Sequence, residues 1–334
     1  MSFKSLLCLA LLVPASSVLA DTVWLKNGDR LTGKIKFYDG SKLVLETEYG
    51  GNIALDWKKV ATLESDQEML VKQDAVTGER AKALQPAENG HVTLANGDAP
   101  KTVELASIEQ ILKPKPLVED FIWKGNIDAS VDYKRADRDT DDYDIKLKTQ
   151  ARHGLWRHNA KADYNRELRD EVVTTDNWGI EYALDRFVTE HWFWQARAEY
   201  KRDDIEDLHR QRTLGTGPGY QFWDNELGAF SVAGLLNRTD YEFSTGEKEN
   251  FYSAGLKWDY NRYLFGKSVQ LFSDGDLGKP LDSVADYTLD AAVGLRYKVT
   301  DWASLNMRAE KDIVSGSDGD MDETRYTLGF GVGW

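Results

Sequence analysis

The chain ends in "RYTLGFGVGW", residues 325–334, where aromatic and aliphatic side chains occupy every second position. Glycine or threonine fills the positions between them, and this period of two predicts a β-strand with one apolar face. A soluble sandwich would carry charged or polar residues on the other face, which here is nearly bare. We therefore expect an outer face that contacts lipid, and glycines that leave room in the lumen of a barrel. The apolar set is Tyr326, Leu328, Phe330, Val332 and Trp334.

The other end of the chain, residues 1–20, reads "MSFKSLLCLALLVPASSVLA". A positive residue, an apolar run and small residues before Ala20 predict a secretory signal peptide that is cleaved after Ala20. A membrane-anchoring helix, the alternative, needs about 18 apolar residues, which is more than this run contains. The chain's one cysteine, Cys8, lies inside the signal peptide, so we expect a mature protein without disulfides, as suits bacterial export.

Composition narrows the class of protein further. The 334 residues carry a net charge of −14, which argues against nucleic acid as a partner. Mean hydropathy is −0.53, although aromatic residues make up 11% of the chain. Low mean hydropathy does not exclude a membrane β-barrel, because a polar lumen offsets its apolar outside.

Period-two segments fill the chain after residue 120 and predict an all-β fold. We count about twelve antiparallel strands, enough to close a transmembrane β-barrel. A soluble sandwich with an aromatic-rich core is the alternative, but it leaves these apolar faces without a partner sheet. The segments are 127–133, 143–149, 158–164, 178–184, 192–200, 214–222, 230–236, 252–260, 269–272, 287–299, 303–309 and 326–334.

The connections between these segments alternate in length. Short ones are expected at 153–157, 185–191, 223–227, 260–267 and 298–302. Longer ones are expected at 134–142, 166–177, 201–212, 238–250, 273–286 and 311–324, and they hold 25 acidic against 13 basic residues. Tight turns on one side and long acidic loops on the other are typical of outer-membrane barrels, as are the many aromatic residues at strand ends.

Residues 21–113 differ from the rest and predict a small periplasmic β-domain. Hairpin turns are expected at 27–29, 39–41 and 50–52, and the order suits a duplicated β-meander or an Sm-like small barrel. Residues 42–63 align with residues 91–112, which indicates two repeats. We therefore expect a signal peptide (1–20), a periplasmic domain (21–113), a proline-bounded linker (114–120) and a barrel (121–334).

Residues 121–334 resemble the salt-induced outer-membrane protein family, the YdiY-like proteins of unknown function. The stretches that carry the resemblance are "WKGNIDAS" at 123–130, "TGPGYQFW" at 216–223, "NFYSAGLKWDYN" at 250–261 and "DETRYTLGFGVGW" at 322–334. The resemblance implies an outer-membrane β-barrel and no catalytic or binding residue. A final strand that ends on Trp334 also resembles the signal that the barrel-insertion machinery reads.

Chemistry-bearing residues are few. His209 lies among acidic residues in a long loop, where a surface hydrolase would place its site, but a solvated, charge-balanced loop is the favoured interpretation. Asp318, Asp320 and Asp322 have the spacing of the first ligands of a calcium loop and predict weak Ca²⁺ or Mg²⁺ binding. Position six of that loop is Glu323 instead of glycine, so it is no EF-hand, and solvated acidic loops are the alternative.

The inward parity of the predicted strands carries charges of both signs. Unpaired charges in a dry interior are costly, so the lumen is either wet or cross-linked by salt bridges, and we expect a narrow, partly obstructed channel. The main predicted lumen charges are Asp128, Lys146, Lys148, Asp163, Glu181, Arg197, Glu199 and Arg308.

These observations favour a non-enzymatic outer-membrane barrel, structural or stress-related, with no cofactor and a periplasmic interaction module. The alternatives are a narrow, weakly cation-preferring channel and a surface hydrolase that uses His209. Expected partners are outer-membrane lipids and lipopolysaccharide, the insertion machinery during assembly, and a periplasmic protein or ligand for residues 21–113.

Overall fold

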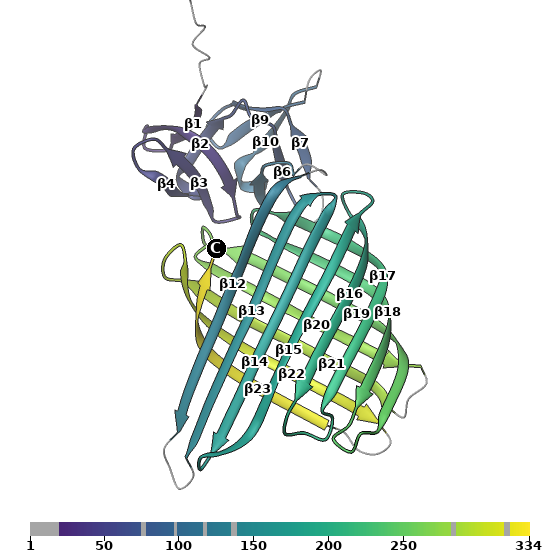
Figure 1. The fold of residues 1–334 in the computed structure, drawn as a ribbon. Coiled ribbons are helices and arrows are strands. Elements are labelled where there is room, and N and C mark those ends of the chain that lie inside the picture. Colours follow the sequence, from purple (N-terminus) through teal and green to yellow (C-terminus); the bar gives the residue numbers. More distant parts are fainter. Residues whose placement is uncertain are drawn as a thin grey trace, which may run out of the picture. The chain divides into compact units, whose positions relative to one another are not determined.

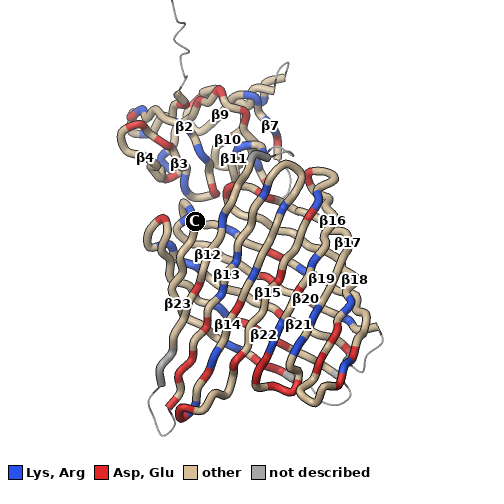
Figure 2. The backbone as a smooth tube through the Cα atoms, viewed as in Figure 1, with Lys and Arg blue, Asp and Glu red and all other residues tan. Residues whose placement is uncertain are grey.

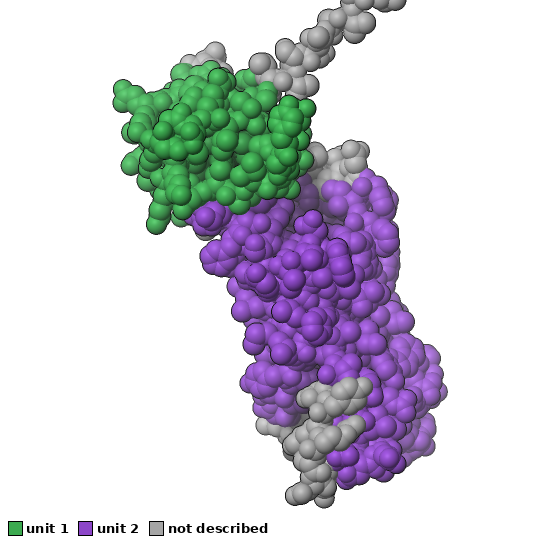
Figure 3. Space-filling model, turned by 90° about the vertical axis from the view of Figure 1, so that its left-hand side faces the viewer, with its two compact units in different colours: residues 1–36, 43–111 green, residues 37–42, 112–334 purple. Residues whose placement is uncertain are grey.

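A computed structural model describes residues 20–74, 78–96, 99–115, 119–134, 139–281, 285–316 and 321–334. The chain divides into two compact units, and each is treated by itself below. Residues 1–36 and 43–111 belong to the first unit, and residues 37–42 and 112–334 to the second (Figure 3). Among the described residues, no helix is long and apolar enough to cross a membrane.

The first unit is built from short antiparallel strands. One sheet has the order β4-β3-β2-β11-β6-β7, with β1 paired to both β2 and β5, and a second sheet has the order β10-β9-β8. The strands are β1 (Asp21–Leu25), β2 (Arg30–Tyr38), β3 (Lys42–Thr47), β4 (Gly51–Asp56), β5 (Val60–Glu64), β6 (Met69–Lys72), β7 (Glu79–Ala81), β8 (Ala83–Pro86), β9 (His91–Ala95), β10 (Lys101–Glu104) and β11 (Gln110–Leu112).

The same order of elements occurs twice in this unit. A hairpin, a 3-10 turn and a further strand follow one another in β3, β4, η1 (Trp57–Lys59) and β5, and again in β9, β10, η2 (Leu105–Ser107) and β11. The two turns contact each other, because the Trp57 indole donates a hydrogen bond of 2.9 Å to the Leu105 carbonyl. Apolar side chains fill the core between the repeats; Ile35, Leu45, Leu63 and Leu94 are each 0% exposed.

The second unit is a closed barrel of twelve antiparallel strands, β12 to β23 in sequence order, as the twelve period-two segments predict (Figure 1). The strands are β12 (Glu119–Lys134), β13 (Thr140–Gly154), β14 (Trp156–Arg169), β15 (Val172–Phe187), β16 (Trp192–Asp203), β17 (Arg210–Asn225), β18 (Gly228–Glu242), β19 (Lys248–Leu264), β20 (Val269–Pro280), β21 (Ala285–Lys298), β22 (Ala303–Gly316) and β23 (Met321–Gly333).

Side chains alternate between the outside and the lumen along each barrel strand. In β23 the apolar set points outward, from Tyr326, which is 81% exposed, to Trp334 just beyond the strand, which is 45% exposed. The glycines between them face inward, and a Cβ on Gly331 would come within 2.4 Å of an Asp128 carboxylate oxygen. The glycines of the terminal strand therefore leave room for lumen side chains.

The predicted long loops are mostly strand. The expected loop 166–177 is a hairpin with a two-residue turn at Asp170 and Glu171, both at positive φ, and the expected loop 273–286 is strand as far as Pro280. This part of the prediction is wrong because outward polar residues and glycines, such as Ser273 and Gly275, interrupt the apolar period while the hydrogen-bonded strand continues. Many acidic residues therefore lie on strand ends and not in loops (Figure 2).

The seam that closes the barrel is short. Within the described residues, β12 and β23 are in register only from Asn126 to Ala129, opposite Phe330 to Gly333. By contrast, β13 and β14 stay in register from Thr140 to His153. Gly125 and Trp334 extend the seam by two backbone hydrogen bonds of 3.1 and 3.0 Å. The Trp334 ring also packs edge-on against Trp123, with centroids 5.6 Å apart.

Candidate functional site

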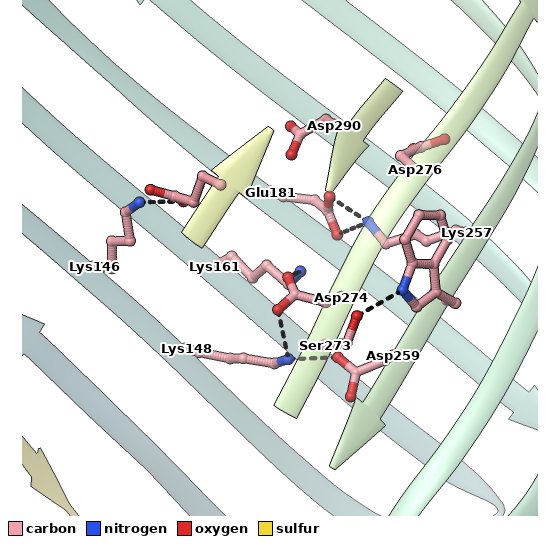
Figure 4. A network of polar contacts seen from close by, with 12 residues as sticks. Lys146, Lys148, Lys161, Glu181, Lys257, Asp259, Ser273, Asp274, Asp276 and Asp290 are labelled. Atoms are coloured by element: carbon pink, nitrogen blue, oxygen red, sulfur yellow. Dashed lines mark hydrogen bonds and ion pairs between the residues drawn. The ribbon is translucent and has the colours of Figure 1, made fainter. Parts of the chain in front are cut away.

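The lumen of the barrel is the candidate site, because inward-facing charges from distant strands meet there. Lys148 of β13 lies 2.5 Å from Asp259 of β19, and Lys161 of β14 lies 2.7 Å from Asp274 of β20 (Figure 4). In a ring of twelve strands, both pairs join strands that are six places apart. These ion pairs therefore cross the full width of the lumen.

A second set of ion pairs lies beside the first. Lys257 of β19 binds Glu181 of β15, and Arg197 of β16 binds Asp276 of β20. Arg197 is also 4.0 Å from Glu181, so the two pairs form one network. Each pair joins strands four places apart, which ties the β15–β16 wall to the β19–β20 wall (Figure 4).

The wall near the seam has its own network. Asp128 accepts hydrogen bonds from Arg296 at 2.6 Å and from Asn306 at 2.9 Å. Glu310 pairs with Arg308 at 3.0 Å and also with Lys146. The cavity between these side chains measures about 10 Å³, which is room for about one water molecule.

One side of the lumen near the short turns is dry. Asp185 is 0% exposed and accepts hydrogen bonds from Arg157 at 2.7 Å and from Gln195 at 2.7 Å. The Arg157 guanidinium lies 5.0 Å from the ring centre of Phe187 and 4.9 Å from that of Phe193. These two rings pack with Ala233 and Leu235 into a buried apolar cluster, so an inward apolar patch fills the lumen there.

Glycine gives the apolar cluster its space. A Cβ on Gly219 would stand 2.2 Å from the Phe193 ring, so the ring would have to move out of its present place in the cluster. Gly219 lies directly opposite Phe193 in the β16–β17 register. The sequence "TGPGYQFW" therefore provides the flat surface against which the Phe193 ring packs.

The linker also contributes to the barrel mouth. Lys115, in the predicted linker, pairs with Asp224 of β17 at 2.8 Å, and Arg152 of β13 reaches the same carboxylate at 2.7 Å. Asp224 therefore joins the segment before β12 to two barrel strands.

Water has access to part of the network. The side chains of Lys148 and Asp259 are 43% and 36% exposed, whereas those of Arg157 and Asp185 are 6% and 0% exposed. The spanning pair Lys148–Asp259 is therefore solvated, whereas the pair Arg157–Asp185 at the apolar cluster is not. The lumen is therefore both cross-linked and partly wet, which combines the two alternatives that the sequence left open.

Most of the predicted lumen charges take part in these networks. Glu199 binds Lys201 at 3.2 Å, and Lys201 lies 3.4 Å from Asp290 across the barrel. Asp163 lies against Gly179 and has no ion-pair partner among the described residues. The structure adds four partners that the predicted lumen charges do not include: Asp274 and Asp276, which fall in an expected loop, and Lys257 and Asp259, which lie on a predicted strand. Their alternation with Gly275, Leu277, Trp258 and Tyr260 was the available signal.

The predicted hydrolase site and the predicted metal site are not assembled among the described residues. The His209 ring lies 4.0 Å from Asp204, beyond hydrogen-bonding distance, so no oriented acid–histidine pair is formed. Asp318 and Asp320 lie outside the described residues, and Asp322 pairs with Lys311 on the neighbouring strand. Among the described residues, no group of three or more His, Cys, Asp and Glu could hold a metal ion.

Solved structures with a similar trace are barrels. The NanC porin covers 64% of this chain and 98% of its own, with a TM-score of 0.39 and 8% identity. The KdgM porin covers 63% and 98%, with a TM-score of 0.35 and 11% identity. The translocator domain of the autotransporter NalP from Neisseria meningitidis covers 65% and 88%, with a TM-score of 0.35 and 12% identity.

No curated protein matches the chain. A family model does: it is described as "Protein of unknown function, DUF481" and matches residues 127–334, which is more than half of the chain.

Proposed function

The chain belongs to the family of unknown function DUF481, and we propose that it is a non-enzymatic outer-membrane β-barrel with a structural or stress-related role. The observation that carries the proposal is the set of ion pairs that crosses the lumen between Lys148 and Asp259 and between Lys161 and Asp274. A barrel that is cross-linked between opposite walls is stiffened, and side chains that cross the lumen narrow any path through it.

The outer membrane is the proposed location, with the barrel crossing it and residues 21–113 in the periplasm. Outward residues support this placement, because apolar side chains such as Leu214, Leu236 and Leu328 lie between aromatic ones near both strand ends. Trp123 and Trp192 lie near the short-turn end, and Tyr252 and Tyr287 near the other. The signal peptide predicted at residues 1–20 supplies the export step.

Residues 21–113 are proposed as the periplasmic interaction module, which binds a periplasmic protein or ligand. The unit has a complete apolar core of its own, so its surface is available for recognition. Assembly of the barrel is proposed to need the insertion machinery, which would read the strand Tyr326–Trp334. Outer-membrane lipids, including lipopolysaccharide, are the proposed surroundings.

A narrow, weakly cation-preferring channel is the second candidate function. The solvated pair Lys148–Asp259 favours it, because water that reaches this pair extends into the lumen. Inward charges of both signs predict weak selectivity, and the acidic strand ends concentrate cations only within a Debye length, about 10 Å at 0.1 M salt.

Planar-bilayer recording separates the two candidates. The closed barrel predicts no current steps for the full chain, and steps once Lys148→Ala and Lys161→Ala together remove both spanning pairs. Lys279→Ala, which removes an outward-facing cation of β20, is the matched control and should stay silent. Steady steps from the unmodified chain would instead establish the channel. A folded but silent double variant would show that the ion pairs do not close the lumen.

A further inference from the structure

Positive charge gathers on the outside of the barrel at one place, the long-loop ends of β16 to β19. Along β17 the outward side chains run from Leu214 to Arg212 and then Arg210, and along β18 Leu236 is followed by Arg238. Arg212 is the first outward residue beyond Leu214 and Arg210 is the second, while Arg238 follows Leu236 and lies opposite Leu214. With Arg202 on β16 and Lys248 on β19 they form what we call the outer basic patch: Arg202, Arg210, Arg212, Arg238 and Lys248.

Strand register makes these five residues neighbours. Arg202 is opposite Arg210, Arg210 is opposite Glu242, and Glu242 is opposite Lys248. A second row lies on the same four strands, two residues closer to the apolar band along each strand. It consists of Tyr200, Arg212, Asp240 and Asn250. Adjacent strands are about 4.8 Å apart, so the patch is about 15 Å wide. Five cations stand beside four carboxylates, Asp204, Asp240, Glu242 and Glu249, in a chain whose net charge is −14.

The patch contains a recess of about 250 Å³ that is open to solvent. Its lining has three cations and three carboxylates, together with Tyr241 and Asn250: Arg210, Arg212, Lys248, Asp240, Glu242 and Glu249. Trp178 and Tyr200 pack beside it in a tilted contact with centroids 5.1 Å apart, and the Arg212 guanidinium lies 5.9 Å from the Tyr200 ring centre. Aromatic rings of this kind sit at the headgroup level of a bilayer.

The cations of the patch can exchange their present carboxylate partners for another anion. Arg212 makes no ion pair among the described residues, and Arg238 lies 3.4 Å from Asp240 with its side chain 53% exposed. Lys248 is 70% exposed and lies 3.7 Å from Glu242, which Arg210 also binds. Exposed ion pairs of this sort contribute little to stability, so an incoming anion displaces the carboxylates at small cost.

We propose that the outer basic patch binds the phosphate groups of a glycolipid of the outer leaflet, that is, lipopolysaccharide. Arginine favours phosphate because its planar guanidinium donates two parallel hydrogen bonds. Four of the five cations are arginines on three adjacent strands: Arg202, Arg210, Arg212 and Arg238. The apolar band directly below the patch would contact the acyl chains. The inference rests on the proposed placement of the barrel, in which the long-loop end faces outward.

The test uses the full chain in detergent, so that it does not depend on where the protein lies in the cell or on whether it conducts. Binding of bisphosphorylated lipopolysaccharide is measured by titration and native mass spectrometry. Arg210→Gln with Arg212→Gln should weaken binding about tenfold, which is about 1.4 kcal/mol. The control, Lys279→Gln with Lys311→Gln, makes the same change in net charge on the outward face of β20 and β22 and should leave binding unchanged.

Two further arms assign the ligand. Dephosphorylated lipopolysaccharide should bind the unmodified chain about as weakly as the double variant binds the intact glycolipid. Inorganic phosphate at the concentration of the lipid should not compete. Three outcomes would each overturn the proposal. The two double variants could bind lipopolysaccharide equally well, the unmodified chain could bind the dephosphorylated glycolipid as tightly as the intact one, or inorganic phosphate could displace the glycolipid.

The single variant Arg212→Gln tests whether a loss of binding is caused by misfolding. It breaks no ion pair among the described residues and should still weaken binding several-fold. Heat-modifiable gel mobility confirms that each variant forms the barrel. Loss of binding in a single variant that keeps this mobility supports the patch, and an unchanged affinity counts against it.

Discussion

The interiors of the two units are filled by opposite chemistry. In the first unit, Val23, Leu43 and Leu63 are fully buried among other apolar side chains. In the barrel most large apolar side chains point outward, and apart from the cluster around Phe187 and Phe193 the lumen is filled by charges such as Lys161 and Asp274. One unit is held by exclusion of water from its core, and the other by a backbone ladder whose lumen is braced with charges. The same kind of substitution should therefore have different consequences in each.

The largest effect is expected at the driest ion pair. Arg157→Met should lower the free energy of unfolding of the barrel by about 3–5 kcal/mol, because Asp185 keeps its charge but loses its cation at a site that water does not reach. The measurement is a urea titration of folded and unfolded barrel by gel mobility. The control is Arg157→Met with Asp185→Leu, which should recover part of the loss. A double variant no more stable than the single one would place the cause elsewhere.

A core substitution in the first unit should come next. Leu63→Ala should cost about 3 kcal/mol, because it leaves a cavity beside fully buried neighbours. We expect residues 21–113 to fold alone, with dispersed amide resonances and a cooperative melt by which the loss is measured. Tyr49→Ala is the control, since Tyr49 is 95% exposed. A random-coil spectrum of the unmodified fragment would show that this unit needs the barrel.

Two lumen arginines should differ from each other. Arg197→Met leaves Asp276 without its cation and should cost about 2 kcal/mol, whereas Arg308→Met should cost less than about 1 kcal/mol because Glu310 keeps Lys146. The same urea titration compares them, each variant serving as the control of the other. Equal losses would mean that inward charges act as a continuous network and not as pairs.

The smallest effect is expected at a surface pair of the first unit. Lys101→Ala removes the 2.9 Å contact with Glu79, but these side chains are 52% and 36% exposed. The expected cost is about 0.5 kcal/mol or less, and it should vanish as salt rises. Thermal melts of residues 21–113 at low and high salt measure it. A loss as large as that of Arg157→Met would erase the distinction between exposed and dry ion pairs.

The outward face of the barrel could be predicted from the sequence because lipid-facing positions repeat with a fixed period. Tyr326 to Trp334 are the clearest example, and the twelve strands followed from the same signal. The extent of the strands could not be predicted in this way. In the middle of β20, on either side of Asp274, outward Ser273 and Gly275 hide the period although the backbone remains paired.

The identity of the lumen pairs was also beyond the sequence. Periodicity assigns Lys148 and Asp259 to the inside, but their contact depends on the tilt and stagger that bring β13 opposite β19. Residue parity contains no information about stagger. The outer basic patch could not be predicted from the sequence for a related reason. Its members come from four strands, and in the sequence each lies in a segment where acidic residues are more frequent.

The short seam between β12 and β23 is the place where we expect the closed sheet to open. A closed sheet has no edge, and to open it must first create one between two strands. Among the described residues, register between β12 and β23 spans only Asn126 to Ala129, so this junction separates with fewer broken ladder bonds than the β13–β14 junction requires. Trp334 holds the end of the seam through Gly125 and Trp123. We therefore expect the sheet to open between its first and last strands, and the amide protons of these strands to exchange with solvent earliest.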